Sequence, residues 1–140
     1  MSRKYEDRRS EKGFSLIELI VVLVILGLLA AVVAPKVYDK LAKGKDQIAK
    51  IQITEIEGAL QLYSFELGRF PSTSEGLEAL VANPGGIESW KGPYLAKSLP
   101  NDPWGRPYAY RCPGLHGDFD VFSFGADGTE GNEDDIVSWK

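Results

Sequence analysis

The sequence is poor in the residue types that most often carry catalytic or metal chemistry. It has one cysteine, Cys112, and one histidine, His116, in 140 residues. A single cysteine excludes a disulfide within the chain, and a single histidine excludes a cluster of histidine metal ligands. Cys112 follows the strand-like run 108–111 and is predicted to be a small packed residue, with a redox or nucleophilic role as the alternative. His116 lies in a glycine-rich turn and is predicted to be solvated.

The chain also has no excess of basic charge. It carries 16 basic and 20 acidic residues, a formal net charge of −4. Binding to nucleic acid requires a basic face that neutralises phosphates, so this composition argues against a nucleic-acid partner. The sequence shows no nucleophile–base pair and no phosphate-binding glycine loop, which also argues against an enzyme.

What the sequence does contain is one long apolar run, FSLIELIVVLVILGLLAAVVA, at residues 14–34. As a helix, these 21 residues would measure about 31 Å, close to the hydrocarbon thickness of a bilayer. Backbone polar groups have no water partners in lipid, so a single span must be helical. The alternative is a buried core helix of a soluble protein, but runs of this length favour a transmembrane span.

The residues in front of this run carry a processing motif. The run Lys12-Gly13-Phe14-Ser15-Leu16-Ile17-Glu18 resembles the cleavage motif of type IV prepilins and the related pseudopilins. In that family a membrane-embedded prepilin peptidase cuts after the glycine and methylates the new terminal phenylalanine. The resemblance implies that residues 1–13 are a cytoplasmic leader and that the mature chain begins at Phe14. Ordinary signal-peptide processing is disfavoured, because Pro35 follows the nearest small-residue cleavage pattern.

Glu18 is the one charge inside the apolar run. A carboxylate costs about 2.5–3.5 kcal/mol at the centre of a bilayer and less near its edge. Glu18 lies four residues after Phe14 on the same helix face, so it can pair with the amine of its own chain or reach the headgroups. The resemblance implies a sharper role, in which Glu18 attracts the Phe14 amine of a neighbouring subunit during assembly. The residues alone leave both interpretations open.

After the apolar run the pattern stays helical and becomes amphipathic up to residue 67, where Gly68 is predicted to end the helix. Gly27 and Pro35 interrupt this pattern. The resemblance implies that the helix loosens over this interval during assembly, and a plain kink at Pro35 is the alternative. The apolar positions of the second half are Ile48, Ile51, Ile56, Ala59, Leu60, Tyr63 and Leu67.

The rest of the chain predicts short elements. Residues 68–107 are expected to be irregular, with a capping box at 72–75, one short helix at 76–82, and Trp104 as a core anchor. Strands are predicted at 108–112, 119–124 and 136–139, forming an antiparallel sheet against helix residues 48–67. These elements predict an α+β fold. The resemblance implies that this fold is pilin-like, with a leader at 1–13, a transmembrane half-helix at 14–34, and an extracytoplasmic domain at 35–140.

An acidic loop separates the last two predicted strands. Residues 125–135 include five acidic residues and no basic one, and carboxylates this close repel each other unless water or a cation intervenes. Oxygen ligands without histidine or cysteine suit calcium. The spacing is not that of an EF-hand, and spacing alone leaves a solvated acidic turn as an equal alternative.

Four short runs resemble the major pseudopilin family of type II secretion. They are residues 69–71 (RFP), 102–105 (DPWG), 124–128 (FGADG) and 132–136 (NEDDI). The last two are similar to that family's calcium loop. The resemblance implies calcium ligands from the carboxylates of Asp127, Asp134 and Asp135 and from the main-chain carbonyls of Phe124 and Thr129. Most type IV pilins instead close this region with a cysteine pair, which this chain lacks.

The resemblance implies a structural subunit that polymerises into the pseudopilus of type II secretion and drives export of folded proteins across the outer membrane. The expected partners are copies of the same chain, minor pseudopilins, an inner-membrane assembly platform and the prepilin peptidase. The expected location is the inner membrane, crossed once, with the C-terminal domain in the periplasm. A type IV pilin subunit of a surface fibre is the alternative, and a membrane-tethered enzyme is disfavoured.

Overall fold

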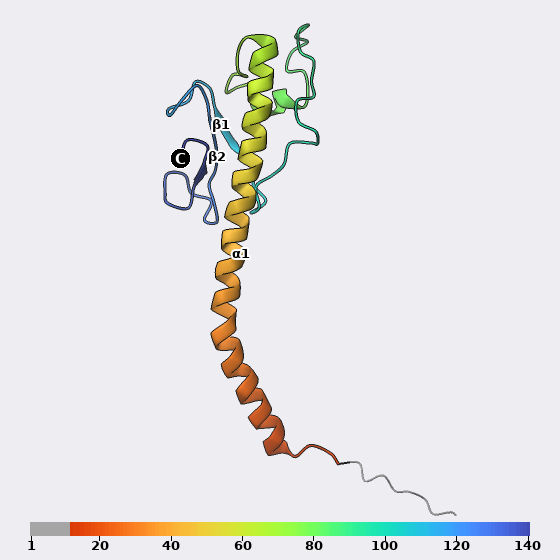
Figure 1. Ribbon diagram of the computed structural model, residues 1–140, viewed down its shortest axis with the longest axis vertical. Helices are drawn as coiled ribbons and strands as arrows, with labels where there is room; N and C mark the ends of the chain where they lie inside the picture. Colours follow the sequence, from red (N-terminus) through yellow and green to blue (C-terminus); the bar gives the residue numbers. More distant parts are fainter. Residues whose placement is uncertain (1–11) are drawn as a thin grey trace, which may run out of the picture. The chain divides into compact units, whose positions relative to one another are not determined.

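The computed structural model describes residues 12–140 (Figure 1). The chain divides into two units, one ending at Lys40 and one covering Leu41–Lys140. The elements in order are helix α1 (Leu16–Leu67), the 3-10 helix η1 (Leu77–Leu80), and strands β1 (Ala109–Arg111), β2 (Asp120–Ser123) and β3 (Ile136–Val137). The predicted α+β fold, with one long helix and a small sheet, is confirmed.

Helix α1 ends at Leu67, as predicted, and contains Pro35 without ending there. Gly68 adopts φ +76° and its N–H donates to the carbonyl oxygen of Ser64 at 2.8 Å. A glycine in this left-handed conformation is a common helix stop. Among the described residues, α1 is the helix that is long and apolar enough to cross a membrane. Loosening of the Gly27–Pro35 interval during assembly stays a prediction.

In the second unit, α1 presents its buried face to the sheet and to the segment that follows the helix, and both lie beside this half of α1 in Figure 1. Ile48 and Ile51 were predicted to belong to the apolar face of the helix, but both are 50% exposed. The inward stripe runs at spacings of three and four from Ala49 through Ile53, so Ile48 and Ile51 fall on the neighbouring face. The buried residues of α1 are Ala49, Ile53, Ile56, Ala59, Leu60 and Tyr63.

The sheet is antiparallel and three-stranded, as predicted, and its strand order is β1-β2-β3. Each strand is shorter than expected. All four residues of the central strand β2 are buried. Val121 joins the helix in the main core. Since side chains alternate along a strand, Asp120 and Phe122 face the other way, where Phe122 contacts the rings of Phe124 and Trp139.

Hydrogen bonds fix the conformation of the segment between α1 and the sheet. The predicted capping box forms: the Ser72 N–H donates to Glu75 Oε2 at 2.7 Å and the Glu75 N–H donates to Ser72 Oγ at 3.2 Å. The Arg69 guanidinium also donates two hydrogen bonds, of 2.7 and 2.8 Å, to the Glu75 carboxylate, and they lower the pKa of Glu75 to about 2. The short helix that follows is a single 3-10 turn at Leu77–Leu80, where the sequence predicted a longer helix at 76–82. Trp104 packs against the core, as predicted.

Candidate functional site

The predicted cleavage point lies in an accessible, non-helical stretch. Gly13 and Phe14 precede α1 by two residues or more, and the Phe14 side chain is 88% exposed. A Cβ placed on Gly13 would meet no atom within 4 Å. The Gly13–Phe14 bond is therefore exposed in this structure, and its cleavage stays a prediction. The leader was predicted to cover residues 1–13, of which residues 1–11 lie outside the described part of the chain.

Glu18 takes part in a capping box at the start of α1. The Ser15 N–H donates to Glu18 Oε2 at 3.4 Å, and the Glu18 N–H donates to Ser15 Oγ at 3.3 Å. This role was not predicted from the sequence, although the Ser15-x-x-Glu18 spacing is the standard signal for it. A carboxylate here also favours the helix start through the helix dipole. Glu18 thus has a local structural role, and its attraction for a neighbouring subunit stays a prediction.

The two ends of the acidic loop touch at Gly125 and Asp134. Gly125 adopts φ +69°, and a Cβ there would overlap the carbonyl group of Asp134. Any other residue at position 125 would be strained by its backbone and would force these ends apart. The loop is therefore closed at its base by a glycine that has no ready substitute.

Within the loop, the acidic side chains bind mainly backbone and amide groups. Asp127 accepts hydrogen bonds from the Thr129 N–H, at 2.9 Å, and from the side-chain amide of Asn132. Asp135 Oδ2 accepts the Gly131 N–H at 2.7 Å, while Asp135 Oδ1 is buried without a partner. Glu130 lies outside this group, because it forms an ion pair with Arg111 at 3.3 Å.

The oxygen ligands of the loop are of the type that suits a calcium ion, but the loop carboxylates do not converge on one point. Across residues 12–140, no three acidic, histidine or cysteine side chains gather into a metal cluster, so Asp127, Asp134 and Asp135 share the loop without converging. The buried, unpartnered Asp135 Oδ1 nonetheless requires a donor or a cation. No hydrogen bond that we find outside the helices and strand ladders of this part of the chain uses the carbonyl oxygen of Phe124 or Thr129. This oxygen-only set is of the kind that calcium prefers.

The loop rests on a network centred on Asp102, which is 4% exposed. Asp102 Oδ1 accepts the N–H groups of Trp104, at 3.1 Å, and Arg106, at 2.8 Å. Ser123 Oγ donates to Asp102 Oδ2 at 2.6 Å and accepts the Gly125 N–H at 3.1 Å. The sequence predicted irregular chain here, and no local pattern signals this network, because its members lie about twenty residues apart.

A second buried carboxylate, Asp120, is the first residue of β2 and connects this strand to the preceding turn by hydrogen bonds. Its oxygens accept the N–H groups of Leu115, at 2.9 Å, and His116, at 3.2 Å. Burial opposes ionisation, but these bonds and the nearby imidazole hold the pKa of Asp120 below its ordinary value. The His116 side chain is 42% exposed, which agrees with the prediction of a solvated histidine, and its ring also lies 3.1 Å from Asp120 Oδ2 and stacks on Trp139.

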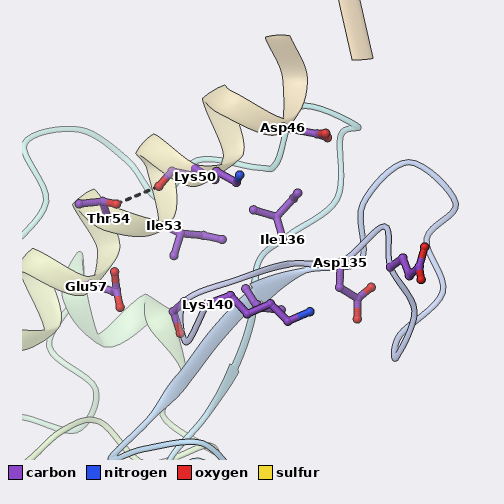
Figure 2. A pocket seen from close by; sticks show the side chains of 11 residues that line it. Asp46, Lys50, Ile53, Thr54, Glu57, Asp135, Ile136 and Lys140 are labelled. Carbon is purple, nitrogen blue, oxygen red and sulfur yellow. Dashed lines mark hydrogen bonds between the residues drawn. The ribbon is translucent and has the colours of Figure 1, made fainter. Parts of the chain in front are cut away.

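Two further polar features of residues 12–140 are a groove and the single cysteine. An open groove between α1 and the C-terminal segment is lined by charges of both signs, among them Lys50, Glu57 and Lys140 (Figure 2). Burial raises the pKa of Glu57. The nearby Thr54 hydroxyl is not free for chemistry, because it donates a hydrogen bond to the Lys50 carbonyl of the same helix at 3.0 Å. Cys112 is half-buried, and its backbone N–H and carbonyl bond Thr73 Oγ1.

Comparison with known proteins places these features in one family. Residues 36–139 match the family model for protein G of the type II secretion system (T2SS), and residues 8–34 match the prokaryotic N-terminal methylation motif. The chain belongs to the T2SS protein G family. The second match covers the cleavage point and Glu18, which supports the interpretation of that region.

Relatives of the protein G family align along nearly the whole chain. The type II secretion system core protein G of Pseudomonas aeruginosa is 47% identical over 139 residues, covering 95% of this chain and 98% of that protein. That of Vibrio cholerae is 44% identical over 137 residues, covering 94% and 93%. The crystal structure of the major pseudopilin from the type 2 secretion system of enterohaemorrhagic Escherichia coli matches with a TM-score of 0.64 and 35% identity. It covers 72% of this chain and 87% of that chain.

Proposed function

We propose that this protein is the major structural subunit of a type II secretion pseudopilus, whose polymerisation drives folded proteins across the outer membrane. The observation that carries the proposal is the presence on one chain of both matches, the methylation motif and the protein G domain. The match favours this function over the alternative of a type IV pilin in a surface fibre. A structural role also agrees with the residues described above, in which the polar groups hold turns together.

In this proposal the chain is held in the inner membrane by residues 14–34, with the leader in the cytoplasm and residues 35–140 in the periplasm. The exposed apolar side chains of the first unit, from Leu16 to Val33, support a lipid environment before assembly. Prepilin peptidase removes residues 1–13 at the open Gly13–Phe14 bond. The mature chain then has 11 basic and 17 acidic residues. Its partners are further copies of itself, minor pseudopilins and the inner-membrane assembly platform.

Deletion of the gene tests this function against the pilin alternative. We expect the deletion strain to retain its exoproteins in the periplasm, and a plasmid copy to restore their release into the culture supernatant. Surface fibres assembled by other pilins should be unaffected. Normal secretion combined with loss of surface fibres would contradict the proposal.

We also propose that the acidic loop binds calcium through Asp127, Asp134 and Asp135 and the carbonyls of Phe124 and Thr129. The buried, unpartnered oxygen of Asp135 supports this proposal. The ion would offset the repulsion among the loop carboxylates and would fasten the segment between β2 and β3, much as a disulfide does in other small domains.

Removing calcium should therefore destabilise the second unit. With calcium at about 100 times its Kd, binding contributes about 2.7 kcal/mol, so chelation should lower Tm by roughly 10 °C in a domain of this size. Thermal unfolding of the full chain in detergent micelles measures this shift. Asp134→Ala should abolish the shift, while Glu133→Ala, an exposed loop acid outside the proposed ligand set, should preserve it. Equal melting with calcium and with chelator would leave the loop as an acidic turn.

A further inference from the structure

Arg106 touches the acidic loop at its base. Its Nη1 donates a hydrogen bond to the carbonyl oxygen of Gly125 at 2.8 Å. A Cβ placed on Gly128 would lie 2.6 Å from Arg106 Cζ and 2.7 Å from Nη2. The guanidinium group therefore lies against the backbone of the loop at two points, Gly125 and Gly128. Gly128 leaves the space that the guanidinium occupies.

The backbone of Arg106 is fixed before its side chain reaches the loop. Its N–H donates to the buried Asp102 Oδ1 at 2.8 Å, and its carbonyl accepts the Asp102 N–H at 2.7 Å. The same Asp102 holds Ser123, whose Oγ accepts the Gly125 N–H. Gly125 is thus hydrogen-bonded through its N–H to Ser123 and through its carbonyl oxygen to Arg106. The turn fixes the backbone of Arg106, and the hydrogen bond to Gly125 holds its guanidinium group.

The charge of Arg106 is not neutralised by a contacting carboxylate. Among residues 12–140, the ion pairs within 4 Å involve Arg69, Arg111 and His116 as the cationic partners, and Arg106 forms none. The loop it touches carries five acidic residues, of which one, Glu130, is paired with Arg111. A fixed positive charge therefore lies against the backbone of a loop that carries four carboxylates with no cationic partner within 4 Å.

We propose that Arg106 is a built-in counter-ion of the acidic loop, which holds the loop together without calcium and weakens its affinity for calcium. The reasoning is electrostatic. A fixed cation relieves the repulsion among the carboxylates when no metal is bound, and it repels a divalent cation that enters the same loop. Arg106 is a positioning residue, because it acts on the loop through the Gly125 carbonyl and through its field. This inference rests on the calcium site proposed above.

The test compares Arg106→Gln, which removes the charge, with Arg106→Lys, which keeps it. Calcium titration of the full chain in detergent micelles, followed by calorimetry or tryptophan fluorescence, gives the Kd. We expect Arg106→Gln to bind calcium about fivefold more tightly than the unaltered chain at low salt, and Arg106→Lys to stay close to it. The difference should shrink in 0.5 M sodium chloride, because salt screens the field of the guanidinium. In chelator, Arg106→Gln should melt at a lower temperature than both other proteins.

The outcomes separate this inference from the calcium proposal. If the unaltered chain binds calcium and Arg106→Gln binds it no more tightly, the counter-ion role is wrong while the calcium site stands. If Arg106→Lys gains as much affinity as Arg106→Gln, the cause is the lost contact and the charge-based proposal is again overturned. If neither the unaltered chain nor Arg106→Gln binds calcium, the calcium site itself is wrong and this inference fails with it.

Discussion

Glu18→Gln should abolish filament assembly while leaving the start of α1 folded. Glutamine preserves the capping-box hydrogen bonds with Ser15 but removes the negative charge. If Glu18 neutralises the Phe14 amine of a neighbouring subunit, the variant leaves that ammonium without a partner in an apolar environment. A cost of about 3 kcal/mol for each added subunit would reduce the association constant about 100-fold.

Ser15→Ala separates the two roles of Glu18. It removes the hydroxyl that accepts the Glu18 N–H, and it keeps the carboxylate. We expect this variant to weaken the start of the helix by about 1 kcal/mol and still to assemble. The measurement is the amount of sheared filament per cell, with the methylated monomer in the membrane quantified as a control for processing. Filaments from Glu18→Gln at the normal level would show that Glu18 serves only as a helix cap.

Asp120→Ala should destabilise the fold through the outer face of the sheet. The side chain is fully buried and accepts the Leu115 and His116 N–H groups, with the Arg111 guanidinium 3.9 Å away. Alanine would leave these donors without an acceptor and Arg111 without its buried partner. Removing the acceptor of partly buried N–H groups costs about 1–3 kcal/mol. Chemical denaturation of the full chain in micelles measures the loss.

The pH dependence of this effect has a definite sign. The folded chain lowers the pKa of Asp120, so ionised Asp120 contributes stability that is fully present above the unfolded-state pKa of about 3.9. This contribution is lost as the pH falls through the lower folded-state pKa. The stability difference between the unaltered chain and Asp120→Ala should therefore narrow below about pH 4.

Asp118→Ala is the matched control, since Asp118 is an exposed acid on the same turn and its carboxylate forms no hydrogen bond or ion pair that we find in the described part of the chain. It should change stability by less than about 0.5 kcal/mol. Similar losses from the two alanine variants, or a difference that widens in acid, would contradict the role assigned to Asp120.

The parts of the fold that could be predicted are those set by neighbouring residues. The apolar run, the amphipathic period and Gly68 together define α1, and alternating aromatic and β-branched residues mark the three strands. The inward face of α1 was less certain, because two adjacent apolar stripes are present. Which stripe is buried depends on Val121 and Ile136, some seventy residues later.

The polar networks could not be predicted for the same reason. Asp102, Ser123 and Gly125 form one hydrogen-bonded group only because the turn and β2 are brought together by the folded core. Likewise, nothing local shows that Arg106 reaches Gly125. The Ser15–Glu18 capping box is different, because its spacing is a local signal and was available in the sequence.

Mass spectrometry of subunits from purified filaments tests the central claim most directly. When the chain is produced together with the assembly platform and prepilin peptidase, sheared filaments should consist of residues 14–140 with one methyl group on the Phe14 amine. Filaments built from chains that still begin at Met1, or no polymeric fraction containing this protein, would contradict the account.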